Sequence, residues 1–221
     1  MDVAEAIVER RSVRGFLDKE IEPALLKEIA VRSARAATGG NIQPWHVDIV
    51  HGASMRELKA IMAGKMERRE TETPGYDIYP KEMTDLYRAR TFAIGEEMYG
   101  RLGIPREDKK ARAIWFARNF QFFGAPAAYF VTVDRRMGPP QWADLGMYLQ
   151  NLMLLAVEHG LATCPQECWA VFPTTIEGFL NTPSERMLFC GVAIGYEDKD
   201  DPANLTRSAR APEEEWLTIK A

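Results

Sequence analysis

A run of five residues near the N-terminus, Arg10 to Arg14, concentrates charged hydrogen-bond donors. It reads Arg-Arg-Ser-Val-Arg, which places three guanidinium groups and one hydroxyl within five positions. Arginine is protonated at any working pH, and its planar fork of N–H donors matches the oxygens of a phosphate. The residues themselves leave two interpretations open: an anion-binding site, or an exposed basic turn.

Several standard catalytic patterns are absent from the sequence. His46, His51 and His159 form no HxH, HxxxH or HExxH spacing, and Cys164 and Cys168 have no second cysteine pair, so we expect no bound metal. The sequence also contains no GxSxG, Walker A or GxGxxG pattern. A hydrolase or a classical dehydrogenase is therefore disfavoured.

Length and composition predict a single domain of residues 1–221 with a sizeable core, since 46% of the chain is hydrophobic. The net charge of −4 argues against a nucleic-acid-binding protein. Three cysteines give no disulfide framework, and the N-terminal residues lack a secretory signal, so we expect a cytoplasmic protein. The most apolar stretch, 142–162, contains Asp144 and Glu158, which argues against a membrane partner.

Hydrophobic periodicity predicts an alternation of helices and strands. Helices are expected at 2–9, 23–37, 53–65, 82–102, 106–122, 141–159 and 173–180, and strands at 45–51, 125–133, 161–167 and 187–196. The strands at 125–133 and 187–196 are apolar on both sides, which indicates burial on both faces.

Two segments stand out from this core. Residues 67–80 are charged and contain Pro74 and Gly75, so we expect a mobile loop or lid there. Together with the next two predicted helices this loop would form a helical cover inserted at 67–122. The tail, 207–221, carries Trp216 and little else to bury, and is expected to pack on a partner subunit.

The polar segments of the chain, taken in order, resemble the FMN-dependent nitroreductase family. The matching segments are Arg-Arg-Ser-Val-Arg-Gly-Phe at 10–16, Gly-Gly-Asn-Ile-Gln-Pro-Trp-His at 39–46, Phe-Phe-Gly-Ala-Pro at 122–126, Asp-Leu-Gly-Met-Tyr-Leu-Gln-Asn-Leu at 144–152, Gly-Leu-Ala-Thr-Cys-Pro-Gln-Glu at 160–167, Gly-Tyr at 195–196 and Arg-x-Pro at 210–212. The details are most similar to the branch of nitrobenzoate reductases, and more distantly to the iodotyrosine deiodinases.

This resemblance implies an α+β nitroreductase-type fold: a central, mostly antiparallel sheet surrounded by helices, in an intertwined homodimer with FMN at the subunit interface. It assigns Arg10 and Ser12 to the FMN phosphate and Arg11 to the phosphate and ribityl chain. Arg210 would complete the phosphate site; two positions before it, Ser208 replaces a lysine found in some relatives.

The flavin ring is assigned to three further segments by the resemblance. Arg14 would lie at the pyrimidine edge, where a cation stabilises the negative charge of the reduced ring. A loop from the partner subunit would contact the ring through Thr38, Gly39, Asn41, Gln43 and Pro44. The turn over the other face comprises Pro165, Gln166, Glu167 and Cys168, with the backbone N–H of Glu167 directed at flavin N5. Glu167 and Arg14 are thus the candidate catalytic residues.

Substrate contacts are predicted at Gly40, Tyr87, Arg88 and Asn119. Arg88 and its neighbour Arg90 are candidates to bind an aromatic carboxylate, although an exposed helix face explains them equally well. Asn119 aligns roughly with a lysine of the deiodinase relatives, so the resemblance does not favour iodotyrosine as the substrate.

The implied activity is ping-pong hydride transfer, in which NAD(P)H reduces FMN and a small nitroaromatic or quinone-like acceptor then takes the electrons. Two alternatives remain open at this stage. One is another flavin reaction on the same scaffold, such as reductive dehalogenation, and the other is a flavin-binding protein that stores or senses FMN without turnover. The sequence does not choose between NADH and NADPH.

Overall fold

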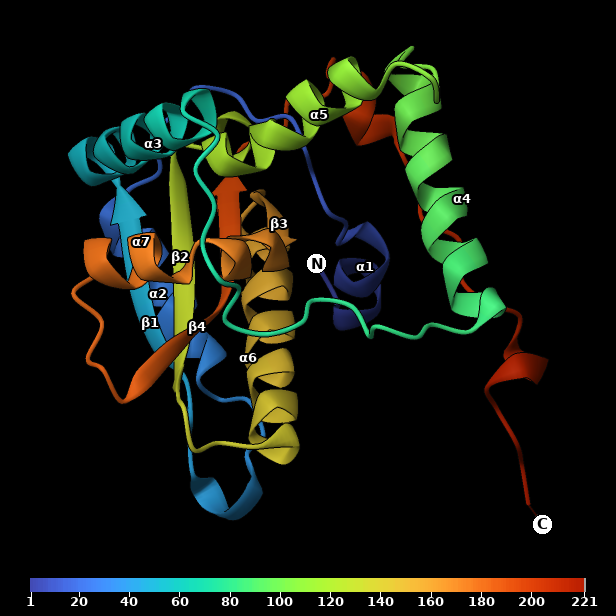
Figure 1. Cartoon of the computed structure of the whole chain (residues 1–221). Helices are drawn as coiled ribbons and strands as arrows, with labels where there is room; N and C mark the ends of the chain where they lie inside the picture. Colours follow the sequence, from blue (N-terminus) through green and yellow to red (C-terminus); the bar gives the residue numbers. More distant parts are fainter. Residues whose placement is uncertain (221) are drawn as a thin grey trace.

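The computed structural model describes residues 1–220 and centres on a four-stranded antiparallel sheet (Figure 1). Its strands are β1 (His46–His51), β2 (Ala127–Asp134), β3 (Ala162–Gln166) and β4 (Arg186–Gly195), in the spatial order β1-β2-β4-β3. All three pairings are antiparallel. The α+β class and the antiparallel sheet predicted from the sequence are confirmed.

Helices surround this sheet (Figure 1). The α-helices are α1 (Val3–Glu9), α2 (Pro23–Ser33), α3 (Gly52–Glu67), α4 (Asp85–Arg101), α5 (Lys109–Ala117), α6 (Pro139–Glu158) and α7 (Pro173–Phe179). Short 3₁₀ turns are η1 (Gly39–Asn41), η2 (Arg118–Gly124), η3 (Glu167–Val171), η4 (Pro202–Leu205) and η5 (Glu213–Glu215). Among residues 1–220, no helix has the length and apolar character needed to cross a membrane.

Each face of the sheet has its own hydrophobic core, which explains the apolar runs of β2 and β4. Along β2, Phe130 points into one core and Tyr129 into the other, because neighbouring strand residues face opposite sides. The first core packs against α3 and contains Trp169 of η3. The second packs against α2 and α6, and there Tyr129 and Tyr148 donate hydrogen bonds to carbonyls of α2, at 2.9 and 3.0 Å.

The predicted helix at 23–37 is too long, since α2 ends at Ser33. The following residues fold onto the N-terminal end of α6 instead. Thr38 Oγ1 donates to Asp144 Oδ2 at 2.8 Å, and the Gly39 N–H donates to the same oxygen at 3.2 Å. The Thr38 hydroxyl also accepts from the Gln43 N–H at 3.0 Å. These side-chain bonds compete with the helical ladder and stop it.

The predicted helix at 106–122 is also wrong at its end, because α5 stops at Ala117. Residues 118–124 form η2, in which Phe122 and Phe123 have φ values of 52° and 54°. Such left-handed backbone is unfavourable for a residue with a Cβ. Both rings are almost completely buried in the core beside Trp115 and Trp169, and this burial offsets the local cost.

The expected loop at 67–80 has no regular structure beyond the end of α3 at Glu67, yet its middle is tied to the sheet layer. The Gly75 N–H donates to the Ala170 carbonyl at 2.9 Å. The Tyr76 hydroxyl donates to the Phe189 carbonyl, and its ring packs edge-on against Trp142 at 5.3 Å. Gly75 and Tyr76 are therefore fixed to neighbouring elements, and a mobile lid stays a prediction only for residues 77–80.

Helices α4 and α5 extend away from the sheet (Figure 1). No residue of α4 is buried. The tail runs along α4, where Arg90 pairs with Glu215 and the Arg207 N–H donates to Glu97 Oε1 at 3.4 Å.

Candidate active site

The Arg10–Arg14 run leaves α1 and is held in place against β3. Val13 is buried and its N–H donates to the Thr163 carbonyl at 2.9 Å, while Ser12 forms a β-bridge with Thr163. Extended backbone alternates its side chains, so burying Val13 turns Ser12 and Arg14 to the opposite side. Both of these residues line the same cavity.

That cavity, of about 760 Å³, is lined mainly by cationic side chains, with Glu9 as the one anion. Arg10 and Arg14 enter it from the N-terminal run, and Arg207 and Arg210 enter it from the tail. Among residues 1–220, none of these four guanidinium groups has a carboxylate partner within salt-bridge distance. Desolvation, together with the charge of Arg210, lowers the pKa of Arg10. Cations without carboxylate partners gathered in one cavity favour an anionic ligand.

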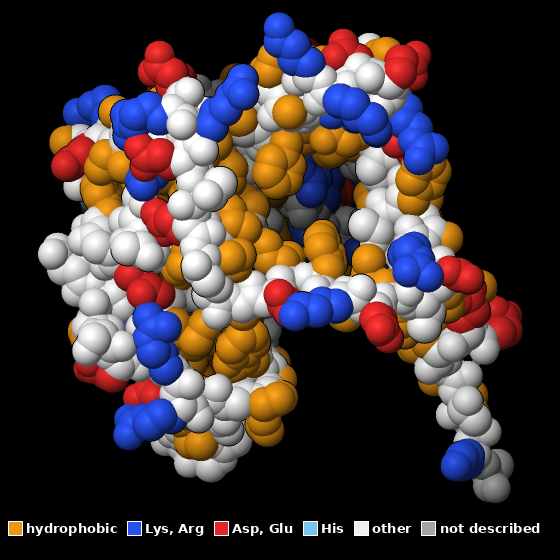
Figure 2. All heavy atoms as spheres, in the orientation of Figure 1, with side chains coloured by type: hydrophobic (Ala, Val, Ile, Leu, Met, Phe, Trp, Pro, Cys, Tyr) orange, Lys and Arg blue, Asp and Glu red, His pale blue; other side chains and the backbone are white. Residues whose placement is uncertain are grey.

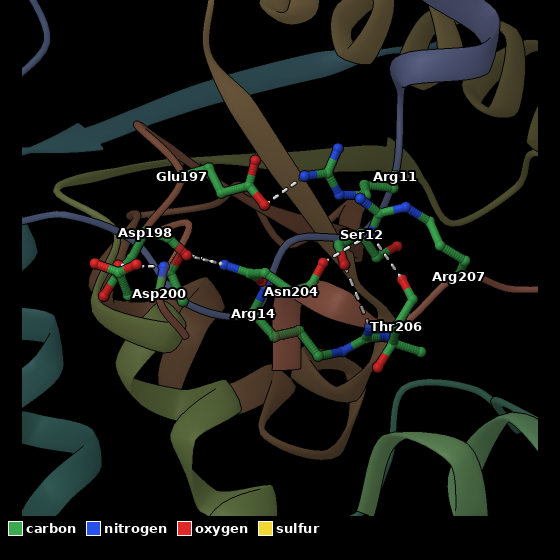
Figure 3. Close-up of polar contacts among 10 residues, drawn as sticks. Arg11, Ser12, Arg14, Glu197, Asp198, Asp200, Asn204, Thr206 and Arg207 are labelled. Atoms are coloured by element: carbon green, nitrogen blue, oxygen red, sulfur yellow. Dashed lines mark hydrogen bonds and ion pairs between the residues drawn. The ribbon is translucent and has the colours of Figure 1, made fainter. Parts of the chain in front are cut away.

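Arg11 behaves differently from its neighbours. It pairs with Glu197, whereas Arg14 Nη1 donates only to the Ser12 carbonyl at 3.4 Å (Figure 3). The Arg11 guanidinium, expected to bind a phosphate, thus already has a carboxylate partner. Arg207, which the sequence reasoning missed, uses Nη1 on the carbonyls of Asn204 and Thr206, at 2.7 and 3.1 Å. Its nearness to Arg210 in the sequence was the available signal.

Asn204 ties the N-terminal run to the segment that precedes the tail (Figure 3). Its Oδ1 accepts from the Arg14 N–H at 2.7 Å, and its Nδ2 donates to the carbonyls of Gly15 and Asp198, each at 2.8 Å. The side chain is 3% exposed. Gly15 must be glycine here, since a Cβ would lie 2.4 Å from the Asp201 side chain.

We expect Asn204→Leu to destabilise the fold by about 1–3 kcal/mol, because it leaves the Arg14 N–H without a partner and removes one of the two donors to each of the Gly15 and Asp198 carbonyls. Thermal unfolding measures this effect. Asn204→Asp, which keeps the acceptor for Arg14 but loses the amide donor, should cost part of it through the Gly15 and Asp198 carbonyls. Equal melting temperatures for Asn204→Leu and the parent protein would contradict this account of the junction.

A second cavity of about 530 Å³ adjoins the first, and Arg14, Ile94 and Thr206 line both. One wall is the turn Pro165–Cys168. The facing walls come from α4, α5 and the irregular segment, residues 68–84 between α3 and α4. Figure 2 shows the hollow between the sheet layer and α4, with hydrophobic side chains around it and Lys or Arg atoms at its depth. The first cavity, lined by the arginines, is called the cationic cavity, and the second is called the aromatic cavity; the two adjoin at Arg14.

The turn Pro165–Cys168 is supported from beneath by buried side chains. Gln166 is 3% exposed, and its Nε2 donates to the Asn119 carbonyl at 2.8 Å. The Trp169 Nε1–H in turn donates to Gln166 Oε1 at 3.3 Å. A Cβ on Gly191 would lie 2.4 Å from Trp169, so β4 needs glycine where this indole packs.

Comparison with known proteins decides the family. The model of the nitroreductase family matches residues 7–196, which is most of the chain. The chain belongs to the nitroreductase family. This confirms the resemblance seen in the sequence.

Characterised relatives cover nearly all of this nitroreductase. A 4-nitrobenzoate reductase of Pseudomonas putida is 32% identical, over 95% of this chain and 91% of the relative. A nitrobenzene nitroreductase of Ectopseudomonas oleovorans is 31% identical, over 98% and 96%. The crystal structure of the FMN and NADPH-dependent nitroreductase NfnB from sphigopyxis sp. strain HMH superposes with a TM-score of 0.95 at 43% identity, covering 100% of both chains.

The structure brings only part of the predicted site together in one chain of this nitroreductase. Arg10, Arg11, Ser12, Arg14 and Arg210 line the cationic cavity, and Arg14, Asn119, Pro165, Gln166, Glu167 and Cys168 line the aromatic one. Tyr87 and Arg88 line neither cavity; Arg88 pairs instead with Asp85 at 2.7 Å.

The predicted loop contacts Thr38, Gly39, Gly40, Asn41, Gln43 and Pro44 also line neither cavity. The loop lies at the N-terminal end of α6, where Thr38 and Gly39 bind Asp144, and in Figure 1 this end is remote from α4 and α5. Within one chain this loop therefore does not contribute to either cavity. Pro44 is buried in its own chain, which leaves it little surface for a ligand.

Sequence reasoning missed most of the aromatic wall. Tyr79, Tyr99, Trp115 and Phe116 line the second cavity, together with Met98. These residues come from the irregular segment, α4 and α5. No single motif holds them, and only the folded arrangement of the cover brings them to one place.

Proposed function

We propose that this nitroreductase is an FMN-dependent NAD(P)H oxidoreductase that reduces nitroaromatic or quinone-like acceptors. The observation that carries the proposal is the set of four guanidinium groups without carboxylate partners in one cavity, opening into an aromatic cavity. A ligand with a phosphate at one end and a flat ring at the other matches this pair. The relative NfnB, described as FMN and NADPH-dependent, agrees with it.

The residues present fit FMN by their chemistry. Arg10, Ser12, Arg207 and Arg210 would hold the phosphate, and Arg207 supplies a cation where Ser208 replaces the lysine of some relatives. Arg14, which lines both cavities, would lie beside the ring. The Pro165–Cys168 turn would cover one ring face, with the Glu167 N–H as the donor to N5.

When bound, FMN supplies a ring that accepts a hydride and later donates it. The chain then has three tasks. Arg14 stabilises negative charge on the reduced ring, the turn at Glu167 orients it, and the aromatic wall keeps water from the acceptor. A nitro group that gains one hydride and one proton and releases water becomes a nitroso group. No side chain is needed as a covalent nucleophile.

Arg14→Ala should lower the reduction potential of bound FMN more than it weakens FMN binding. Removing the cation takes away on the order of 1–2 kcal/mol of stabilisation from the reduced ring, which corresponds to a few tens of millivolts for a two-electron couple. A spectroelectrochemical titration of the variant and the parent protein measures the shift. An unchanged potential would remove Arg14 from this role.

We further propose a homodimer in the cytoplasm, with a site completed by the partner. Exposed apolar side chains on α1 and the tail support it: Val8 is 80% exposed, Trp216 69% and Ile219 84%. The predicted ring contacts of the loop 38–44, which lines neither cavity in its own chain, agree with a contribution from a second copy. The free thiols of Cys164, Cys168 and Cys190 suit a reducing compartment.

Steady-state kinetics test the proposed activity. Oxidation of NADPH or NADH is followed while the concentration of a nitroaromatic acceptor is varied, with FMN-saturated protein. We expect parallel double-reciprocal lines, since the two substrates use the site in turn. A yellow protein that oxidises neither nicotinamide with any acceptor would instead be a flavin-binding protein, and the reductase proposal would fail.

A further inference from the structure

The last residue of β3, Gln166, has a buried side chain whose two amide atoms both bond to protein. The residue is 3% exposed. Its Nε2 donates to the Asn119 carbonyl at 2.8 Å and to Asn119 Oδ1 at 3.3 Å, and its Oε1 accepts from Trp169 Nε1 at 3.3 Å. These bonds occupy the donors of the amide. Any effect of Gln166 on the aromatic cavity therefore passes through its backbone.

The backbone leaves the sheet at the same residue. Gln166 pairs with Gly191 where the pairing of β3 with β4 ends, and its ψ is 90°, whereas a regular antiparallel strand has about 135°. The ψ of one residue sets the direction of the next N–H, so the torsion at Gln166 determines where the Glu167 N–H points. That N–H donates to no carbonyl or side chain of residues 1–220. Its direction is thus set by Gln166 and not by a partner of its own.

Both partners of the Gln166 side chain belong to densely packed parts of the fold. Asn119 lies in η2, whose Phe122 is 0% exposed, and Trp169 is 0% exposed and packs on Phe122 at a centroid distance of 4.7 Å. Gly191, the strand partner of Gln166, has no side chain, and the Trp169 indole fills that space. The Gln166 amide is therefore held between two buried segments that restrict its rotation.

We infer that Gln166 is a positioning residue: its side-chain bonds fix the Glu167 N–H at flavin N5 and thereby lower the reduction potential of bound FMN. The inference rests on the proposed function, which places the ring against the Pro165–Cys168 turn. A donor held at N5 favours the oxidised ring, because N5 then offers a lone pair, whereas in the reduced ring N5 itself carries a hydrogen. Arg14 acts in the opposite direction, since its charge favours the reduced ring.

Gln166→Met tests this role, since it keeps the length of the side chain and removes its bonds. The potential of bound FMN is titrated anaerobically with a chemical reductant and a reference dye, and the Kd of oxidised FMN is measured by quenching of flavin fluorescence. We expect this Kd to rise by roughly three- to tenfold, as for the loss of one neutral hydrogen bond. The potential should rise by about 15–30 mV, which is the same factor for a two-electron couple.

A purely structural role for Gln166 predicts a different result. Damage to the turn that weakens the binding of both redox forms equally raises the Kd of FMN but leaves the potential unchanged. Only the loss of a contact that prefers the oxidised ring raises the Kd and the potential together. An unchanged or lowered potential in folded Gln166→Met would overturn the inference.

Trp169→Phe provides a second variant at the other end of the same bond. It removes only the donor to Gln166 Oε1 and keeps the bonds to Asn119, so the potential should rise by less than in Gln166→Met. If Gln166→Met does not fold, Trp169→Phe decides alone. A potential equal to that of the parent protein would then overturn the inference.

Gln121→Met is the matched control. Gln121 also lies in η2, and its Nε2 donates to the Lys59 carbonyl at 2.9 Å, but it lines neither cavity. The same substitution there removes a similar bond without touching the turn, so the potential should stay at the parent value. A rise equal to that of Gln166→Met would overturn the inference, because the effect would then not be specific to the turn.

The chemical reductant separates this inference from the proposed function. FMN that shows the expected shifts but is not reduced by NADPH or NADH would overturn only the proposed function. FMN that is reduced by a nicotinamide but has one potential in all variants would overturn only the role of Gln166. Protein that binds no FMN would overturn both.

Discussion

Arg10→Ala is expected to weaken FMN binding by about 1.5–3 kcal/mol, or roughly 10- to 150-fold in Kd, as for the loss of a charge-assisted hydrogen bond. Arg10 is half-buried beside Arg210, and burial together with that neighbouring charge lowers its pKa. A bound phosphate offsets the repulsion between these two like charges. Its binding free energy at this pair is therefore larger than at a single exposed arginine. Quenching of flavin fluorescence on titration with FMN-free protein measures the Kd.

Riboflavin separates this explanation from general damage, since it lacks the phosphate. Arg10→Ala should leave riboflavin affinity almost unchanged while FMN affinity falls. Arg56→Ala, an exposed arginine of α3 that lines neither cavity, should change neither. A parallel loss of both ligands would mean that Arg10 supports the fold rather than the phosphate.

Trp169→Ala is expected to cost about 3–5 kcal/mol of folding free energy, the range for truncating a buried large aromatic side chain. The indole is 0% exposed and packs on Phe122 at a centroid distance of 4.7 Å and on Phe130 at 5.4 Å. Gly191 leaves the space that it occupies. The Oε1 of Gln166, in the Pro165–Cys168 turn, would also lose its donor.

Thermal or urea unfolding at one fixed FMN concentration measures the loss. Trp169→Phe refills much of the volume but not the hydrogen bond to Gln166, so it should lose less than Trp169→Ala. A stability change below about 1 kcal/mol for Trp169→Ala, the size typical of a surface substitution, would contradict its place at the centre of the core.

Strands and core helices could be predicted because their sequence signal is local. The apolar runs of β2 and β4 reflect burial on two faces, and α6 has the length and periodicity of a core helix. Errors arose where long-range contacts outweigh local preference. Thr38 binds Asp144, 106 positions away in the sequence, and the preceding helix is shorter than its local pattern predicts. Phe122 adopts left-handed backbone because this places its ring against Trp169 in the core.

The site divides in the same way. The arginine run and the Pro165–Cys168 turn are each one continuous stretch of sequence. Their residue motifs and their order along the chain were therefore enough to predict them. The pairing state of each arginine depends on distant partners, and only the fold shows that Arg11 has Glu197 while Arg10 has no carboxylate. The aromatic cavity is built from α4, α5 and the irregular segment together, and no local pattern encodes that arrangement.

Anaerobic half-reactions test the central claim most directly. FMN-loaded protein is mixed with one equivalent of NADPH without oxygen, and a nitroaromatic acceptor is added afterwards, while the visible flavin absorbance is followed. The account predicts bleaching on the first addition and full return of the oxidised spectrum on the second, with the acceptor reduced in equal amount. Flavin that stays oxidised with both NADPH and NADH, or that is reduced but unaffected by any nitroaromatic or quinone-like acceptor, would contradict it.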